Sequence, residues 1–271
     1  MNNEASIRLI AFLGIFAAVA AWESMSPRRQ LTTSKASRWF SNISITLIGT
    51  AIVRSLFPLL AVTFAANKTS LGLLNLISLP YFVKVLIGVL AFDLIIYGQH
   101  VMFHSVPLLW RLHMMHHADL DIDVTTGLRF HPIEVMLSMG IKIAAVVVIG
   151  PPVPAVILFE ILLNGTSMFN HGNIRIPLDV DRLIRLIIVT PDMHRVHHSV
   201  IIKETNSNFG FNFPLWDRVF GTYRDQPAAG HDNMTIGLSQ FRDEKKLTLP
   251  WLLVLPFIGK PGTYPIIRKR L

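Results

Sequence analysis

The chain contains no cysteine in its 271 residues, and only 15% of them are charged. The absence of cysteine excludes a disulfide framework, a thiolate metal site, an iron–sulfur cluster and a cysteine nucleophile. An average soluble domain carries about 25% charged residues. With 51% hydrophobic residues and a mean hydropathy of +0.47, the chain is neither an ordinary cytosolic globule nor a disordered segment.

Several motifs of soluble enzymes are also missing. The sequence has no G-x-x-x-x-G-K-[ST] or G-x-G-x-x-G run for nucleotide phosphates, and no G-x-S-x-G nucleophile elbow. The net charge is +8, with a pI near 10.0. Because the basic residues gather in the loops and tail of a lipophilic chain, they fit membrane topology and anionic headgroups better than a nucleic-acid partner.

Long apolar runs predict an all-α, polytopic membrane protein with about four to five transmembrane helices, since a span needs roughly 20 apolar residues. The first run could instead be a secretory signal peptide, but its Glu4 and Arg8 leave little net positive charge, which favours a retained helix. The second run contains Arg54 and Pro58 and is long enough to tilt or kink. The predicted spans are 7–23, 39–66, 81–99 and a hairpin over 132–169.

Lysine and arginine are unevenly distributed among the connecting segments, which predicts the orientation of the spans. The loop 24–38 and the region 170–271 are basic, whereas the loop 67–80 contains only Lys68. We therefore expect a single integral membrane domain over 1–271 with its N-terminus outside. Its cytoplasmic helical cap comprises 100–131 and 170–246, and an interfacial segment follows over 247–271.

Eight of the 11 histidines fall into three tight groups. Residues at i, i+3 and i+4 share one face of a helix, so each group can direct two or three imidazoles at one point. Neutral imidazole is a ligand for zinc, copper, iron and nickel. Eight ligands exceed the needs of one metal ion, which predicts a dimetal site on the cap. The groups are His100 and His104; His113, His116 and His117; and His194, His197 and His198.

This pattern of one H-x-x-x-H and two H-x-x-H-H motifs resembles the fatty acid hydroxylase/sterol desaturase superfamily of membrane di-iron proteins. Flanking residues strengthen the resemblance: Asp93 to Tyr97 lead into the first pair, and Asn208-Phe209-Gly210 precedes a closing motif that begins at Trp216. Specific motifs cover roughly residues 85–225. Val101 departs from the arginine that many members have after the first histidine, which affects a neighbouring contact and not the ligands.

The resemblance implies that the eight grouped histidines and His171 are metal ligands. For His131, the roles of ligand, ligand-orienting residue and substrate-facing residue are all open. Asp93 lies seven residues before His100 and could orient it, because ligating imidazoles usually donate to a carboxylate or carbonyl. Alternatively, Asp93 pairs with a span residue such as Arg54. Asp217 is expected to fix a turn, His231 to be a solvated surface residue, and Glu134, Glu160 and Asp192 to be weaker orienting candidates.

The resemblance further implies a membrane-bound, O2-dependent lipid oxidoreductase with two iron ions as cofactor, although imidazole ligation also permits zinc. Hydroxylation of a sterol, fatty acyl or related lipid is favoured over desaturation or cleavage. The chain has no haem or flavin signature, so an external reductase, ferredoxin or cytochrome is expected as electron donor. Two other classes remain open: a metal transporter, and a non-catalytic lipid-binding membrane protein stabilised by metal. Neither the lipid substrate nor the oligomeric state follows from the sequence.

Overall fold

The computed structural model describes residues 2–57, 61–67, 72–258 and 260–266. Within these residues there is no strand, and the only β-pairing consists of two isolated bridges. The predicted all-α class is therefore confirmed. In chain order, the helices are α1 (Asn2–Met25), α2 (Lys35–Leu56), α3 (Ala61–Asn67), α4 (Tyr81–Ser105), α5 (Pro107–His117), α6 (Pro132–Ile149), α7 (Val153–His171), α8 (Leu178–Ile184), α9 (Pro191–His197), α10 (Ile202–Thr205), α11 (Leu215–Val219), α12 (Gly230–Asn233) and α13 (Leu249–Ile258).

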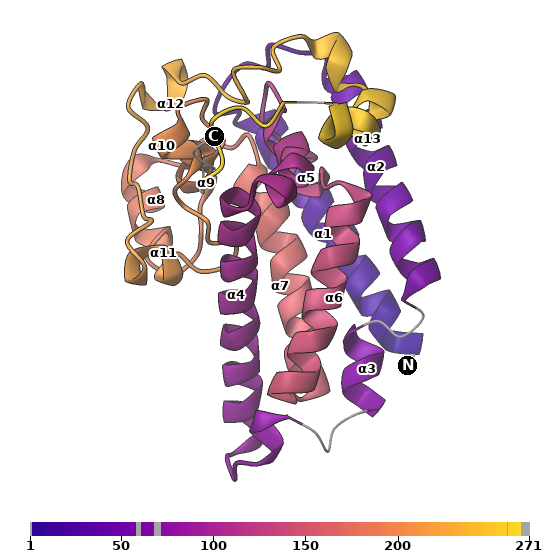
Figure 1. Ribbon diagram of the computed structural model, residues 1–271. Helices are drawn as coiled ribbons and strands as arrows, with labels where there is room; N and C mark the ends of the chain where they lie inside the picture. Colours follow the sequence, from indigo (N-terminus) through magenta and orange to yellow (C-terminus); the bar gives the residue numbers. More distant parts are fainter. Residues whose placement is uncertain (1, 58–60, 68–71, 259, 267–271) are drawn as a thin grey trace.

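Four of the described helices are long and apolar enough to cross a membrane: α1 from Glu4 onward, α4, α6 and α7. Figure 1 shows α4, α6 and α7 running side by side, with α1 behind them. Their packing core includes Phe92 of α4, which stacks on Phe159 of α7 with ring centroids 5.0 Å apart. The prediction of a multi-pass membrane protein is confirmed, and the described residues contain four candidate spans, within the predicted four to five.

The run predicted as a single span over 39–66 is divided into α2 and α3. Pro58, where we expect a kink, lies outside the described residues. α2 is not among the four span candidates. Several of its buried side chains are polar, and Asn42 and Thr46 bond to the Thr125–Leu128 segment of the cap. α2 therefore links the bundle to the cap through hydrogen bonds.

The predicted hairpin consists of α6 and α7. His131 caps α6 by accepting a hydrogen bond from the backbone N–H of Ile133, and Pro132 occupies the first helical position, where its missing N–H costs nothing. The helix ends at Gly150, whose φ of 62° is left-handed and favours glycine. Pro151 and Pro152 follow and cannot extend the helix.

The two ends of the bundle are held by different contacts. At one end, Gly72 approaches Gly150 so closely that a side chain at position 72 would clash with its backbone. At the other end, the basic loop after α1 meets the cap, where Arg28 pairs with Asp192 and Asp232. The loop predicted to share a side with the histidine motifs therefore does so. That this side is the cytoplasmic one stays a prediction.

α13 begins the C-terminal region and packs across α5 and α2. Leu252 and Leu255 join a core with Trp110, whose indole N–H donates to the carbonyl of Pro261 at 3.0 Å. The opposite face of α13 leaves Trp251 and Phe257 exposed. All residues of α13 are apolar, so its exposed face is apolar as well. The interfacial placement of 247–271 stays a prediction.

Candidate metal centre

All nine histidines that the sequence singles out as ligands are buried and meet where the bundle joins the cap. Each comes from a helix that ends near this point, so the helix termini direct the side chains inward. His100 and His104 lie in the last turns of α4, His113, His116 and His117 in α5, His171 at the end of α7, His194 and His197 in α9, and His198 directly after α9.

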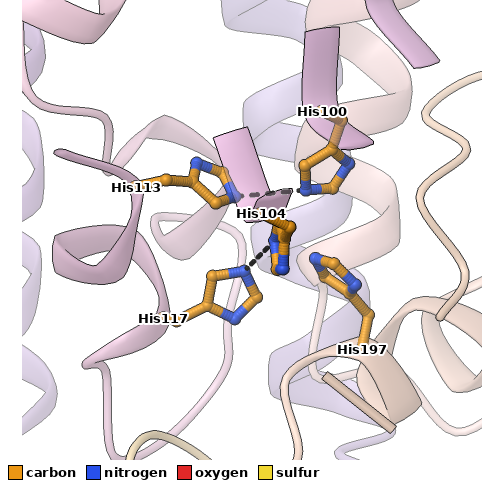
Figure 2. A group of neighbouring side chains, drawn as sticks. All are labelled: His100, His104, His113, His117 and His197. Carbon is orange, nitrogen blue, oxygen red and sulfur yellow. Dashed lines mark hydrogen bonds between the residues drawn. The ribbon is translucent and has the colours of Figure 1, made fainter. Parts of the chain in front are cut away.

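The nine imidazoles form two groups, in each of which one nitrogen per ring lies within 4.8 Å of the others. Figure 2 shows the larger group, whose rings converge from α4, α5 and α9 on one space. We call it cluster A; it comprises His100, His104, His113, His117 and His197. Cluster B comprises His116, His171, His194 and His198. The clusters adjoin, since the ring centroids of His117 and His198 are 4.6 Å apart.

Each H-x-x-H-H motif contributes to both clusters. In the first motif, His113 and His117 belong to cluster A and His116 to cluster B. The second motif has the opposite division, with His194 and His198 in cluster B and His197 in cluster A. Consecutive residues of a helix are about 100° apart around its axis, so adjacent histidines such as His116 and His117 can face different clusters. This spacing therefore produces two adjacent sites from one pair of motifs.

In cluster A, four Nδ1 atoms have hydrogen-bond acceptors behind them, and three of these acceptors come from one loop. The Nδ1 of His197 donates to the carbonyl of Ser207 at 2.6 Å, that of His100 to the carbonyl of Phe209 at 2.8 Å, and that of His104 to the side chain of Asn206 at 3.0 Å. The fourth, on His113, donates to Glu134 at 2.7 Å. Donation through Nδ1 leaves Nε2 as the free lone pair that faces the cluster.

The loop 206–209 is itself held rigidly. Asn208 has a left-handed φ of 52°, and its side-chain amide donates to the carbonyls of Met193 and Arg224. The carboxylate of Asp217 accepts from the backbone N–H groups of Phe209 and Gly210, both at 2.8 Å. Asp217 therefore fixes the turn, as the sequence predicts, and this turn positions cluster A.

Cluster B is anchored differently. The Nδ1 of His171 donates to the carbonyl of Ser167, one turn earlier in the same helix, at 2.6 Å. The Nδ1 of His116 donates to the carbonyl of Arg129 at 3.1 Å. The Nδ1 atoms of His194 and His198 have no hydrogen-bond partner among the described residues. Cluster B thus depends on nearby backbone and is anchored at fewer of its rings.

A buried ionic network lies behind α5. Arg129 is fully buried and donates to the carbonyl of Met115, next to His116. Arg38 from α2 forms a bidentate pair with Asp119 at 2.9 Å and reaches Asp123 at 2.6 Å. Burial opposes the ionisation of Asp119, but the attraction of Arg38 and Arg129 outweighs it and lowers the pKa to about 2. The network therefore stays charged at neutral pH and fixes the C-terminal end of α5.

Five buried histidines in or directly after α5 and α9 are neutral at physiological pH. Burial penalises the charged imidazolium, and the neighbouring rings repel further charge, so their pKa values fall well below 6.5. Neutral imidazole is the form that binds metal, so these rings need not lose a proton first. The residues concerned are His116, His117, His194, His197 and His198.

His131 and Asp93 lie outside both clusters. His131 caps α6, and its Nε2 lies 3.2 Å from the carbonyl of Leu253 in α13. Asp93 accepts a hydrogen bond at 2.8 Å from the indole N–H of Trp216 in the closing motif, rather than pairing with Arg54. The hydrogen bond attaches the closing motif to α4 about two helical turns before His100.

Two further expectations change. His231 was expected on the surface, which is wrong: its side chain is 4% exposed and its Nε2 lies 3.7 Å from Asp192. Burial lowers its pKa to about 4. Glu134, a weak candidate, is the carboxylate that faces His113, whereas Glu160 pairs with Arg8 and Lys142 within the bundle.

Sequence reasoning missed the backbone acceptors at Ser207, Phe209 and Arg129, because any residue supplies a carbonyl. The available signal was indirect. Asn208-Phe209-Gly210 stands out as a motif because an asparagine tolerates the left-handed turn and the glycine leaves room for Asp217: a side chain at position 210 would meet that carboxylate at 2.8 Å.

The sequence profile of the fatty acid hydroxylase family matches residues 85–222, slightly more than half of the chain. The match contains every histidine of clusters A and B. The chain belongs to the fatty acid hydroxylase family. The resemblance inferred from the histidine motifs is therefore confirmed, and with it the class of protein, a lipid-modifying oxidoreductase. No solved structure gives a significant match.

Curated relatives of this family member support the same class. Ornithine lipid hydroxylase OlsE of Rhizobium tropici is 26% identical over 237 residues, covering 84% of this chain and 70% of that protein. Alkylglycerol monooxygenase of Homo sapiens is 28% identical over 148 residues, 53% of this chain. Cholesterol 25-hydroxylase of Mus musculus is 27% identical over 145 residues, also 53%. The chain spans only 30% and 47% of the length of the last two proteins.

Proposed function

We propose that this chain is a di-iron, O2-dependent lipid hydroxylase whose metal ligands are the nine histidines of clusters A and B. One observation carries the proposal: nine buried imidazoles converge on two adjoining points at the end of four apolar helices. Two adjoining nitrogen-rich sites suit a pair of transition-metal ions. His131 and Asp93 are not assigned as ligands, because neither belongs to cluster A or cluster B.

The residues present fit two metal ions. Several buried ring nitrogens lack a hydrogen-bond partner among the described residues: Nδ1 of His117, His194 and His198, and Nε2 of His197. A buried polar atom without a partner costs about 1–3 kcal/mol. Within each cluster, Nε2 atoms approach one another at 3.1 Å, as for His100 and His113 in cluster A and His171 and His194 in cluster B. Cations between the facing Nε2 atoms would offset their mutual repulsion and give the Nε2 of His197 a partner. The Nδ1 atoms of His117, His194 and His198 are on the other side of their rings from Nε2.

The chemistry divides between the metal and the protein. Iron, when bound, supplies the oxygen activation that an unactivated C–H bond requires and that side chains do not provide. In hydroxylation, the substrate C–H bond and O2 give a C–OH group and water, with two electrons and two protons taken up. We expect the electrons to come from an external donor, a reductase, ferredoxin or cytochrome, because the sequence has no haem or flavin signature and no cysteine for an iron–sulfur cluster.

The protein's own residues bind, orient and shield. The acceptors behind Nδ1 fix the ring orientation of His100, His104 and His197. Aromatic rings cover the clusters: Phe130 stacks on His116 with centroids 4.6 Å apart, and Phe211 lies 5.0 Å from His100. Such cover excludes water and limits unproductive reaction of activated oxygen.

The substrate class that we propose is a membrane lipid, and the relatives' names indicate the range: ornithine lipid, alkylglycerol and cholesterol. We place the metal site on the cytoplasmic side, because the basic loop containing Arg28 and Arg29 lies at the cap end.

The decisive experiment combines metal analysis with product analysis. The purified protein is expected to contain about two iron ions per chain and to add oxygen to a component of a lipid extract when O2 and a reductant are present, as measured by mass spectrometry. His116→Ala should lose metal and activity, whereas His231→Gln, which alters a buried histidine outside both clusters, should keep them. Stoichiometric zinc with no oxidised product after iron reconstitution would overturn the proposal.

The same experiment separates the remaining alternatives. A desaturase would yield a product that has lost two hydrogens instead of gaining oxygen. A metal-stabilised lipid-binding protein would retain metal without consuming O2, and a transporter would move metal across vesicles without lipid oxidation.

A further inference from the structure

One surface of the cap exposes large apolar side chains that neither the metal centre nor the four spans explain. It is formed by α8, the residues that follow it, and α11. Its members are between 46% and 73% exposed. We call it the α8–α11 surface; it comprises Leu183, Leu186, Ile187, Leu215, Val219 and Phe220.

The segment of the cap that follows α11 does not share this property. In the described stretch 221–246, which follows α11 directly, no large apolar side chain is exposed. Scattered exposed apolar residues are normal on soluble surfaces, but a contiguous apolar patch marks an interaction site. The concentration on α8 and α11 therefore needs a partner.

Contacts with α4 give the depth of this surface. The indole of Trp216 bonds to Asp93 at 2.8 Å, and Tyr97 bonds to Thr222 at 2.8 Å and stacks on Phe220 at 5.4 Å. Asp93 lies seven residues before His100, about 10 Å along the helix axis. Figure 1 shows α8 and α11 beside the cap-side half of α4, rather than beyond its end. α11 thus lies next to a candidate membrane span, at a level inside that span.

We propose that the α8–α11 surface is embedded in the lipid bilayer, at the boundary between headgroups and acyl chains beside α4. The sequence predicts that the whole of 170–246 lies outside the membrane. Under this proposal, α8, the residues that follow it and α11 contact lipid instead. An apolar surface at the depth of a span meets acyl chains unless protein covers it, and burial in the interface removes that surface from water.

The charges around the surface are mixed, which specifies the kind of lipid contact. Arg182 is exposed but faces Asp179 at 3.1 Å, and Arg218 lies over the ring of Tyr223 at 4.1 Å. Insertion should therefore depend on apolar burial and not on anionic lipids. Vesicles of neutral phosphatidylcholine should suffice.

The absence of cysteine makes the test direct, because any introduced cysteine is the only labelling site. Ile187→Cys and Val219→Cys are labelled with an environment-sensitive nitrobenzoxadiazole dye on the full-length protein in phosphatidylcholine vesicles. Gln226→Cys and Asn233→Cys, at exposed polar positions of the same cap, serve as matched controls. Quenching is compared between iodide in water and a nitroxide placed near the headgroup on a lipid chain.

We expect lipid nitroxide to quench the dye at positions 187 and 219 several-fold more than at the controls, and iodide to show the reverse order. Iodide quenching equal to that of the controls would overturn the inference. Protection from both quenchers, dependent on the protein-to-lipid ratio, would show that a second copy covers the surface and would overturn it equally. If one label perturbs folding, judged by thermal unfolding, Leu183→Cys replaces it. The outcome does not depend on iron or activity, so it is independent of the proposed hydroxylase function.

Discussion

Clusters A and B contain similar numbers of imidazoles, but the protein supports them in different ways. Cluster A rests on the loop 206–209, which is distant in sequence from α4 and is held by Asp217. Cluster B rests on local backbone at Ser167 and Arg129, and two of its rings have no Nδ1 partner among the described residues. We propose that cluster A is ordered without metal, whereas cluster B would gain more of its order from a bound metal.

Removing one ligand from each cluster tests this comparison most strongly. We expect His104→Ala and His194→Ala each to lower activity more than about 100-fold, beyond the loss typical of an outer hydrogen-bond partner. Each variant should keep about one metal ion per chain, because the other cluster keeps all of its rings. Inductively coupled plasma mass spectrometry and product analysis provide the measurement. Loss of both ions in both variants would show that A and B form one cooperative unit.

The ionic network behind α5 supports the backbone on which cluster B depends. Arg38→Met leaves Asp119 and Asp123 buried without their main cation, and breaking one partner of a buried ion pair costs about 3–5 kcal/mol. We expect a clear drop in the thermal unfolding midpoint in detergent, with loss of metal from B before A. Arg54→Met, which alters an exposed arginine of the same helix, is the control. Equal stability of the two variants would contradict the role of the network.

Asp217 tests the support of cluster A without touching a ligand. Asp217→Asn keeps the shape but replaces one accepting oxygen with a donor, so the turn at Phe209 loosens. Loss of an outer partner of this kind typically costs 10–100-fold in metal affinity or activity. In Asp217→Asn, we expect the spectrum of iron in cluster A to change and that of iron in cluster B to stay the same. The control variant Asp232→Asn, at an exposed position, should alter the spectrum of neither cluster. An unchanged spectrum together with lowered stability would assign Asp217 a purely structural role.

The histidine centre is the part of the molecule that the sequence predicts best. The proposed ligands have a fixed spacing that reflects helix geometry, so His113, His116 and His117 can be recognised as a group without a structure. The hydrogen-bond acceptors behind the histidines are harder to predict, because a backbone carbonyl such as that of Phe209 can come from any residue type. Long apolar runs predict α1, α4, α6 and α7 for a similar reason. α2 differs because its polar residues bond to the cap, which depends on tertiary contacts that no local pattern contains.

His231 gives the smallest expected effect and tests whether burial outside the clusters also governs pH behaviour. Its folded pKa is lowered to about 4 by burial, from an ordinary value near 6.5. The unfolded chain therefore binds a proton that the folded chain does not, so His231 favours folding above pH 6.5, and this contribution is lost as the pH falls toward 4. We expect His231→Gln to flatten the loss of thermal stability between those values, measured against the wild-type protein at each pH. Parallel stability curves would mean that His231 is hydrated in solution, as its position in a loop suggests from sequence alone.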